Sequence, residues 1–423
     1  MKKNCLYLFM VASLSLWSCS DDESVVNDSV RVEQAEVEQI VTRANPIDLT
    51  DGERIINKRL QDFSWKFFSV YAQSEDFVGS PLLSPIGLGM SLGIVQNAIS
   101  DVFLEMLLKT QGLEDLPVEE INKFYAKLFK GIGEVDSHVS FMSSNSFWYS
   151  VGNTVSDDFS SILKNYYNVF VCDVDFKEKA TIDKINSWCK GVTGGQIEQI
   201  MNEINCNKYT SFHLLNANHF QASWSEPFAR ENNQIASFYK DNGEVVNVEM
   251  MHNIVSNAKF GTKDNCQIAE LPLSADGFKM FFILPEKGTD VNSLLPNVGQ
   301  QYLDNLTNAD LDIYLPKFEA KSHSFNLWEV MRTMNPELKM DTNQDLNIFS
   351  NVEAGVKDLY LSQGVSLSLD EKGIEVSSSI DLTLGHISAG TPVKASIRLD
   401  RPFIYGIVET STNMPLFIGY YGN

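Results

Sequence analysis

A serine flanked by two glycines is the first arrangement in the sequence that could do chemistry. Gly89, Ser91 and Gly93 match the GxSxG pattern, in which a hydrolase serine sits on a tight turn between a strand and a helix. The context differs here, because Ser84 and Pro85 form a helix-start signal that an apolar run follows directly. Ser91 would lie about two turns inside that helix, where its hydroxyl is packed. We interpret the small residues as a helix-packing face.

Metal and cofactor chemistry has no better support. The histidines are His138, His213, His219, His252, His323 and His386. None of them stands in an HExxH arrangement or at the short spacing of metal ligands. The sequence also holds no Walker-type loop and no dinucleotide fingerprint. We therefore predict no metal, no cofactor and no enzymatic activity.

The cysteines leave their redox state open. Cys5 belongs to an N-terminal apolar run, and Cys19 follows shortly after it. The others are Cys172, Cys189, Cys206 and Cys266, and no pair has CxxC spacing. An exported protein could form disulfides, yet a domain of this size does not depend on them, so disulfides and buried thiols both remain possible.

The composition allows a large core and excludes one class of partner. Of the 423 residues, 43% are hydrophobic, which is enough for a substantial core. The formal net charge of −22 argues against sequence-independent binding of nucleic acid, because phosphate binding needs clustered lysine and arginine. We interpret the acidity as a contribution to solubility.

The N-terminus has the features of an export signal. Two lysines precede an apolar run that ends near Cys19, as in a secretory signal, and the last four residues of this segment resemble a bacterial lipobox. Residues 20–49 are polar and mostly acidic, which is typical of a tether. We predict a signal at 1–19 with Cys19 lipidated, a flexible tether at 20–49 and one domain at 50–423. We expect an exported outer-membrane lipoprotein, exposed at the surface or extracellular.

Helices precede strands in the predicted order of elements. The residues from Thr50 to Glu53 have capping-box spacing, and apolar residues then recur at helical intervals. Further helices are predicted after Ser84 and at 118–129, 158–167 and 180–200, the last of which is interrupted by Gly194-Gly195. Strand-like runs are predicted at 139–149, 169–176, 211–220, 238–251, 266–273, 280–284, 311–315, 403–408 and 416–421. The absence of βαβ alternation predicts an α+β fold.

One late segment has the pattern of a strand although a loop-like stretch follows it. Its first face consists of Ile374, Val376, Ser378, Ile380, Leu382 and Leu384, and its second of Glu375, Ser377, Ser379, Asp381 and Thr383. The residues after it, GHISAGTPVKAS, are mostly small and typical of an exposed loop. We interpret 374–384 as part of a loop that can become a strand.

Short blocks in a fixed order run through residues 50–423. The earlier blocks are Ser84-Pro85-Ile86-Gly87-Leu88, Asn145-Ser146-Phe147-Trp148, Val174-Asp175-Phe176, Ile185-Asn186-Ser187-Trp188 and Thr193-Gly194-Gly195-Gln196-Ile197. The later ones are Leu215-Asn216-Ala217-Asn218-His219-Phe220 with Trp224, Glu270-Leu271-Pro272, Leu315-Pro316-Lys317-Phe318, Arg401-Pro402-Phe403 and Leu416-Phe417-Ile418-Gly419. Together they resemble the serpin family, serine and cysteine protease inhibitors that act once by changing shape. The resemblance implies about three β-sheets surrounded by eight or nine helices, with an exposed reactive-centre loop.

The resemblance also implies a mechanism. In serpins a protease attacks the exposed loop as a substrate and forms an acyl-enzyme; the cleaved loop then enters the central sheet as a strand, and deacylation stalls. The implied hinge residues are Glu371, Lys372, Gly373, Ile374, Glu375 and Val376, and the inserting face continues with Ser378, Ile380, Leu382 and Leu384. This chain would be a suicide inhibitor of serine endopeptidases. The alternative is a non-inhibitory serpin-fold binding protein, in which 374–384 is a resident strand.

Some residues depart from the family pattern in the regions that control opening of the sheet. In serpins these regions are called the shutter and the breach. The residues that the resemblance implies for them here are Ser84, Asn216, Trp224 and Gln363. Gly87 stands where the family commonly has a second serine, and Gln363 where it commonly has a histidine, so we predict a rewired shutter. Ile374 and Val376 are bulkier than the usual hinge residues, which would slow early insertion.

The scissile bond has two possible positions. Counting from Gly373 with the family's usual loop length places it between Ile387 and Ser388, whereas counting back from Pro402 places it nearer Thr391. We prefer Ile387, because inhibitory loops hold the hinge-side length more strictly. A β-branched aliphatic residue at this position favours an elastase-like serine protease; a papain-like cysteine protease is the alternative target. We expect a monomer that meets the membrane only through its lipid anchor.

Overall fold

The computed structural model describes residues 44–74, 77, 79–202, 212–322, 327–338, 348–349, 361–374 and 393–422. The chain separates into two units, Met1–Thr42 and Arg43–Asn423, and all described residues belong to the second. The predicted signal with Cys19, and the predicted loop residues from Glu375 to Thr391, lie outside the described residues. Within the described ranges, no helix has the length and apolar character needed to span a membrane.

Most of the helices lie in the first half of the chain. They are α1 (Asp51–Tyr71), α2 (Pro85–Gln96), α3 (Asp101–Gln111), α4 (Val118–Glu134), α5 (Asp157–Ile162) with its π-helical continuation η1 (Leu163–Tyr167), α6 (Lys179–Val192) and α7 (Leu327–Met334). The described residues also include the short 3₁₀ turns η2 (Arg230–Asn232), η3 (Val291–Ser293), η4 (Leu295–Asn297) and η5 (Gln300–Tyr302). The predicted capping box is confirmed, since the Thr50 hydroxyl accepts from the Glu53 amide and the Glu53 carboxylate accepts from the Thr50 amide.

Two helices were not predicted, and one ends earlier than expected. Helix α3 begins after Ser100, which makes no side-chain cap, so its start carries no strong local signal. Helix α7 is only eight residues long and lies between ranges of strand-like sequence. Helix α6 ends at Val192, two residues before the first of a pair of glycines, and does not continue toward Ile200.

A six-stranded sheet forms the centre of the domain. Its order is β10 (Phe318–Ser322), β11 (Leu361–Leu369), β12 (Gly373–Ile374), β4 (Phe212–Ser223), β2 (Ser140–Ser150) and β3 (Phe170–Val174). Strands β4 and β11 also pair directly, and this pairing is parallel. Parallel neighbours so far apart in the sequence cannot be joined by a tight hairpin, so their contact depends on tertiary packing.

A second sheet of nine strands lies beside the first. It consists of β1 (Leu82–Leu83), β15 (Pro415–Tyr421), β14 (Phe403–Glu409), β8 (Phe278–Pro285), β7 (Cys266–Leu273), β6 (Val245–Lys263), β9 (Thr307–Pro316) and β13 (Val393–Arg398), with β5 (Gln234–Tyr239) on β6. The long strand β6 belongs to two parts of this sheet, because it pairs with β5 and β9 and then with β7. The prediction of one strand at 238–251 was wrong, since a turn containing Asp241-Asn242-Gly243 separates β5 from β6.

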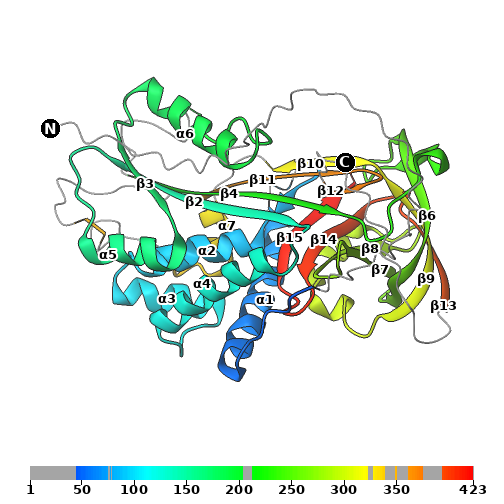
Figure 1. Ribbon diagram of the computed structural model, residues 1–423, viewed down its shortest axis with the longest axis horizontal. Helices are drawn as coiled ribbons and strands as arrows, with labels where there is room; N and C mark the ends of the chain where they lie inside the picture. The colour runs from blue at the N-terminus through cyan, green and yellow to red at the C-terminus, as the bar shows by residue number, and fades with distance from the viewer. Residues whose placement is uncertain are drawn as a thin grey trace, which may run out of the picture. The chain divides into compact units, whose positions relative to one another are not determined.

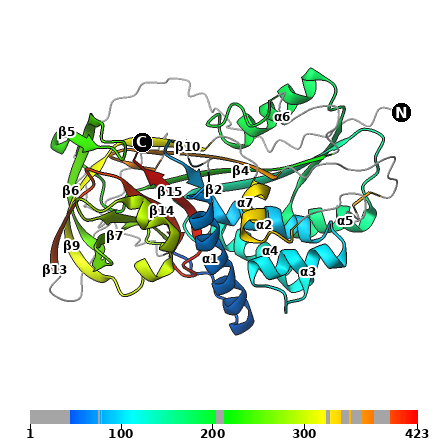
Figure 2. The ribbon, with the colours of Figure 1, turned by 180° about the vertical axis from the view of Figure 1, so that it is seen from behind.

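Helices cover both faces of the six-stranded sheet. Helices α2, α3 and α4 lie on one face and α6 on the other, as both ribbon views show (Figures 1 and 2). Helix α2 is buried along its whole length, and a smaller apolar cluster joins α6 to the opposite face through Ile185, Cys189 and Trp148. The predicted α+β class is confirmed.

The helix-packing interpretation of the GxSxG motif is also confirmed. Ser91 is 1% exposed, and its hydroxyl donates to the carbonyl of Gly87 one turn earlier (3.2 Å). A Cβ atom at Gly89 would lie 2.7 Å from the Tyr125 hydroxyl, and one at Gly93 would lie 2.6 Å from the Tyr167 hydroxyl. The glycines therefore admit two tyrosines against α2.

Candidate functional site

The chain before the predicted reactive loop already occupies one end of the gap between β4 and β11. Ile374 pairs antiparallel with Ala222 of β4 and with Leu369 of β11, and its side chain is 1% exposed. Gly373 pairs with Ser223 in the same register. Strand β12 is therefore a two-residue strand wedged between two neighbours that pair directly with each other farther along.

A tight turn delivers β12 into this position. The Asp370 amide donates to the Gly373 carbonyl (2.9 Å), and the Asp370 carboxylate accepts from the amides of Lys372 (2.8 Å) and Gly373 (3.2 Å). Gly373 has φ of 151°, and a Cβ atom there would collide with the Ala222 carbonyl oxygen. A glycine is needed for the turn to enter the sheet.

The chain segment after β4 clamps the same turn from its other side. The Trp224 amide donates to the Lys372 carbonyl and its indole donates to the Asp370 carbonyl, each at 2.9 Å. The Phe228 amide donates to the Glu371 carbonyl (2.9 Å). The structure thus brings Trp224 together with Glu371, Lys372 and Gly373.

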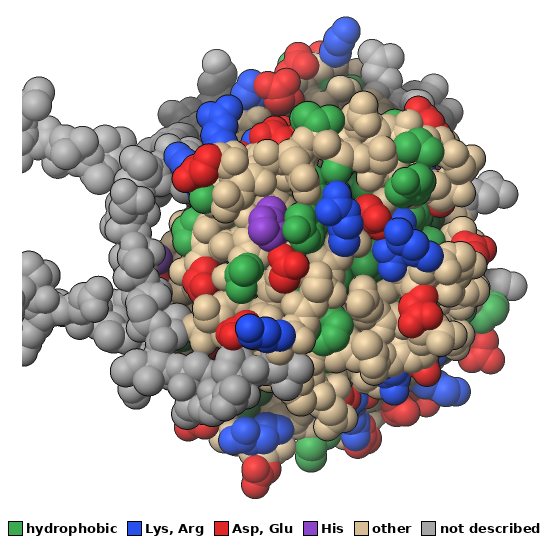
Figure 3. All heavy atoms as spheres, turned by 90° about the vertical axis from the view of Figure 1, so that its right-hand side faces the viewer, with side chains coloured by type: hydrophobic (Ala, Val, Ile, Leu, Met, Phe, Trp, Pro, Cys, Tyr) green, Lys and Arg blue, Asp and Glu red, His purple; other side chains and the backbone are tan. Residues whose placement is uncertain are grey.

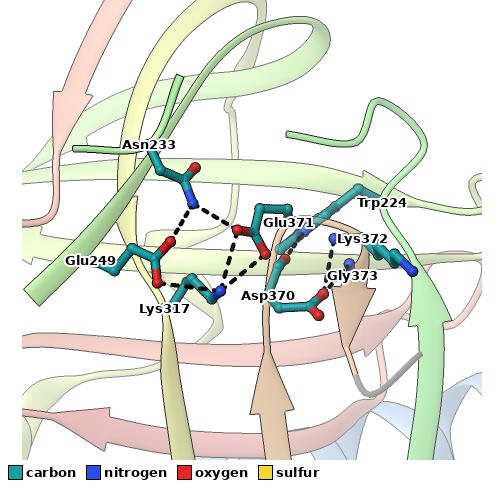
Figure 4. A network of polar contacts seen from close by, with 8 residues as sticks. All are labelled: Trp224, Asn233, Glu249, Lys317, Asp370, Glu371, Lys372 and Gly373. Carbon is teal, nitrogen blue, oxygen red and sulfur yellow. Dashed lines mark hydrogen bonds and ion pairs between the residues drawn. The ribbon is translucent and has the colours of Figure 1, made fainter. Parts of the chain in front are cut away.

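The Glu371 side chain joins the turn to the nine-stranded sheet (Figure 4). Its carboxylate accepts from the side-chain Nδ2 of Asn233 (2.6 Å) and forms an ion pair with Lys317 (3.2 Å). Asn233 also donates to Glu249 (2.8 Å), which pairs with Lys317 at 3.4 Å. Asn233, directly after η2, and Lys317, between β9 and β10, therefore hold the carboxylates of Glu249 on β6 and Glu371 on the turn in one network.

The charges in this network stabilise one another. Burial opposes ionisation of Glu371, but hydrogen bonds from the backbone, Lys317 and Asn233 outweigh it and lower its pKa. A hydrogen bond from Asn233 is the main reason that the pKa of Glu249 is lowered. Burial alone would lower the pKa of Lys317, yet its two carboxylate partners raise it above the ordinary 10.5. All three groups are charged near neutral pH.

Beyond β12 the gap is closed. Residues 361–365 of β11 pair in parallel with residues 214–218 of β4, and Gln363 lies directly opposite Asn216. Gln363 accepts from the Ser84 amide (2.8 Å) and donates to the Ser84 carbonyl (2.9 Å) and to the Asn216 side chain (3.2 Å). The Ser84 hydroxyl donates to the Leu416 carbonyl (2.9 Å). A strand entering between β4 and β11 must separate Gln363 from Asn216.

The structure brings the predicted shutter residues together and adds residues that sequence reasoning missed. Ser84, Asn216 and Gln363 form one buried group, to which Asn218 belongs as well. Asn218 stands two positions after Asn216 on the same strand, so strand alternation could have placed both on one face. Asn233 had no comparable signal, because it lies in a turn far from the hinge in sequence.

Several predicted site residues remain untested. Glu375, Val376, Ser378, Ile380, Leu382, Leu384, Ile387, Ser388 and Thr391 lie outside the described residues. Ile374 is buried between Ala222 and Leu369, and the expectation that its bulk slows early insertion stays a prediction.

The described residues give no support for disulfide or metal chemistry. Cys172, Cys189 and Cys266 are buried and form no disulfide, and burial raises the pKa of Cys189 to about 12; Cys206 lies outside the described residues. Where the structure describes side chains, no group of three potential ligands could hold a metal ion. On the face that Figure 3 shows, acidic and basic side chains are interspersed and hydrophobic ones are scattered among polar neighbours.

Known proteins are similar in sequence to this chain over most of its length. The family model described as serpin (serine protease inhibitor) matches residues 58–423. Iripin-3 of Ixodes ricinus is 26% identical over 345 residues, which cover 79% of this chain and 87% of that protein. Antithrombin-III of Homo sapiens is 25% identical over 384 residues, which cover 87% of this chain and 82% of that protein.

A solved structure gives the same result for the fold. The thermophilic serpin tengpin, in its native state, superposes with a TM-score of 0.75 at 24% identity, over 90% of this chain and 97% of that chain. The expected serpin fold is confirmed, with the two parts of the nine-stranded sheet and the six-stranded sheet as its three sheets. The chain belongs to the serpin family.

Proposed function

We propose that this serpin inhibits serine endopeptidases as a suicide substrate. The observation that carries the proposal is the position of β12, where the chain directly before the reactive loop has entered the gap between β4 and β11. The gap is open to β12 at one end and closed by a parallel ladder at the other. This is the geometry expected of a sheet that accepts one more strand.

The chemistry belongs to the protease, and this chain supplies the substrate. The serine oxygen of the protease bonds to the carbonyl carbon of Ile387, and the peptide bond to Ser388 breaks. The nitrogen of Ser388 leaves as an amine and takes the proton that the serine gave up. If the loop enters the sheet before water cleaves the new ester, the protease remains attached through Ile387. Inhibition is a competition between insertion and hydrolysis.

Burial of the loop supplies the driving force. The further apolar side chains that insertion would place on the inner face are Val376, Ile380, Leu382 and Leu384. At about 1.5 to 3 kcal/mol for each, their burial contributes roughly 6 to 12 kcal/mol, as an upper estimate. This upper estimate is comparable to the stability of an ordinary domain, which is ~5 to 15 kcal/mol. Ile374 adds nothing further, since it is buried before cleavage.

The proposal includes an elastase-like target protease and attachment of the inhibitor to the membrane through a lipid. Ile387 favours an elastase-like enzyme, whose small apolar pocket accepts a β-branched side chain. Cys19 would be lipidated after export, and residues 20–43 of the predicted tether would hold the inhibitor away from the membrane. Its last residues, 44–49, instead pack on the domain, where Asn45 donates to Val135, Ile47 donates to Ser411 and Leu49 is buried. Mass spectrometry of the mature N-terminus tests this part, because a free Cys19 or cleavage at another residue would contradict it.

The inhibitory function is tested by incubation with elastase-like, subtilisin-like, trypsin-like and papain-like proteases. We expect an SDS-resistant complex with an elastase-like enzyme and a released C-terminal peptide that begins at Ser388. Ile387→Arg is the matched control and should transfer the complex to a trypsin-like enzyme. Cleaved loop with fully active protease in every case would contradict the proposal and favour a non-inhibitory binding protein.

A further inference from the structure

A polar cavity lies on the nine-stranded sheet beside a bulge of β6, where the pairing of β6 with β9 shifts between Val255 and Ala258. Its volume is about 200 Å³, which is the space of roughly seven water molecules at ~30 Å³ each. The residues that line it belong to β6, β7, β8 and β9 and to the turns after β7 and β14; they are Ser256, Asn257, Lys259, Glu270, Pro272, Asp276, Lys279, Asn308 and Thr410. The cavity therefore has room for a small molecule.

Strand pairing places the charged residues of the cavity on one face of the sheet. Lys259 on β6 pairs directly with Glu270 on β7 and with Asn308 on β9. Lys279 on β8 pairs with Pro272, which shares a face of β7 with Glu270 because side chains alternate along a strand. The two lysines and Glu270 therefore project to the same side.

The uncompensated charge in the cavity belongs to Lys259. Glu270 is 3% exposed and forms an ion pair with Lys279 (3.1 Å), so these two charges balance each other. Asp276 lines the cavity from an exposed position. Neither it nor any other carboxylate of the described residues forms an ion pair with Lys259. A ligand with one negative charge would give this ammonium its partner.

Several polar side chains of the cavity also have no hydrogen-bond partner within the part of the chain that the structure describes. The Thr410 hydroxyl is buried in the cavity wall and makes no hydrogen bond there. The side chains of Ser256, Asn257 and Asn308 make none with described residues either. Because a buried polar group is normally hydrogen-bonded, the unpartnered hydroxyl of Thr410 indicates a polar occupant.

These groups favour a small hydroxycarboxylate as the ligand. Its carboxylate would pair with the Lys259 ammonium, and its hydroxyl would exchange hydrogen bonds with the free hydroxyl and amide groups. A phosphate group carries a charge of about −1.5 to −2, which one lysine does not balance. No arginine is among the described residues that line the cavity, so a bidentate contact with phosphate is absent as well. An apolar ligand would leave the Thr410 hydroxyl unpaired.

The cavity wall is bonded to the chain segment that follows β4. The amides of Ser256 and Asn257 donate to the Glu226 carboxylate, at 3.0 and 3.3 Å. The Pro272 carbonyl accepts from the amide (3.2 Å) and the hydroxyl (3.1 Å) of Ser225. Three residues of the wall thus hold Ser225 and Glu226 in place.

That segment is the one that clamps the hinge turn. Ser225 and Glu226 lie between Trp224 and Phe228, whose amides donate to the carbonyls of residues 372 and 371, each at 2.9 Å. A ligand that contacts the wall binds best when the wall holds this position. It therefore favours the state in which the clamp on the turn is made.

We propose that the cavity is an effector site for a small hydroxycarboxylate, which pairs with Lys259 and stabilises the clamp on the hinge turn. The site is separate from the gap between β4 and β11 and from the reactive loop. Its occupancy requires neither a protease nor cleavage, so the proposal goes beyond the inhibitory function and is tested without it.

Binding is tested by calorimetric titration of the full-length protein with lactate and with glycerate. We expect saturable binding of at least one of these acids, and none of lactamide, the uncharged analogue of lactate. Lys259→Met should weaken binding by about tenfold or more, because a hydrogen-bonded charge pair is lost. Lys259→Arg keeps the charge and should retain most of the affinity. Lys263→Met, farther along β6 and outside the cavity, is the matched control and should bind as the wild type does.

The link to the hinge is tested by hydrogen exchange and mass spectrometry of a peptide that covers residues 369–373. The saturating acid should slow exchange of this peptide several-fold in the wild type and leave it unchanged in Lys259→Met. If Lys259→Met does not fold, Lys259→Gln takes its place in both measurements.

Each contrary outcome overturns a stated part of the inference. Absence of saturable binding, or equal binding of lactate and lactamide, overturns the site. Tighter binding of inorganic phosphate than of either acid overturns the ligand class. Equal affinities of wild type and Lys259→Met overturn the assignment of Lys259. Binding that leaves exchange of 369–373 unchanged overturns the link to the hinge.

Discussion

Substitution of Ile374 by arginine tests whether the first residue in the sheet controls inhibition. Ile374 lies between Ala222 and Leu369 before cleavage and keeps these neighbours if the strand extends in register. Burial of its side chain contributes about 1.5 to 3 kcal/mol, and a buried arginine without an ion-pair partner would cost several kcal/mol more. Before cleavage the hinge can move out of the sheet, so the uncleaved form should lose at most about 3 kcal/mol.

After cleavage, Ile374→Arg should slow insertion of the loop relative to hydrolysis of the acyl-enzyme, and this effect on the rate is large. Each 1.4 kcal/mol added to the barrier slows insertion tenfold, so about 3 kcal/mol slows it on the order of a hundredfold. Ile374→Arg should therefore turn the inhibitor into a substrate: protease titration should show a sharp rise in the number of inhibitor molecules consumed per protease. Ile374→Val, which costs only about 0.5 to 1.5 kcal/mol, is the matched control. A wild-type yield of SDS-resistant complex from Ile374→Arg would refute the reasoning.

Further predictions concern the turn, the helix beneath the sheet and pH. The pKa of Glu371 is lowered in the folded protein, so its contribution to stability is present above its ordinary pKa of 4.5 and is lost as the pH falls through the folded value. Glu371→Gln should therefore reduce the fall in the free energy of unfolding at acid pH, measured by urea denaturation. The raised pKa of Lys317 contributes stability below 10.5 that is lost as the pH rises through the folded value, and Lys317→Met should remove this alkaline loss. Gly373→Ala should lower the melting temperature by several degrees, because the turn needs positive φ and close approach to a carbonyl; an unchanged melting temperature would count against the turn geometry. Ser91→Ala should leave complex formation with protease unchanged, and a loss of ester hydrolysis would revive the hydrolase interpretation.

The sequence predicted the elements that carry strong local signals. Thr50 and Ser84 begin helices through side-chain caps, and these depend only on residues within one turn. The turn between β5 and β6 was missed although Asp241-Asn242-Gly243 is a turn sequence, because the apolar residues on both sides suggested one continuous strand.

Residues of the hinge and shutter could be predicted only where they belong to a family motif or lie on one face of a strand. Gln363 was expected to act in the shutter, but its contacts with both backbone groups of Ser84 depend on packing of α2 against the sheet. The link from Glu371 through Asn233 to Glu249 joins residues more than 100 positions apart, and no local pattern encodes it.

The central claim is that cleavage moves residues 376–384 between β4 and β11. Hydrogen exchange of the amides of these residues, followed by mass spectrometry before and after cleavage near Ile387, measures this movement directly. We expect fast exchange in the intact protein and strong protection in the cleaved one, with residues 361–365 and 214–218 protected in both forms. Fast exchange of 376–384 after cleavage would contradict the insertion mechanism.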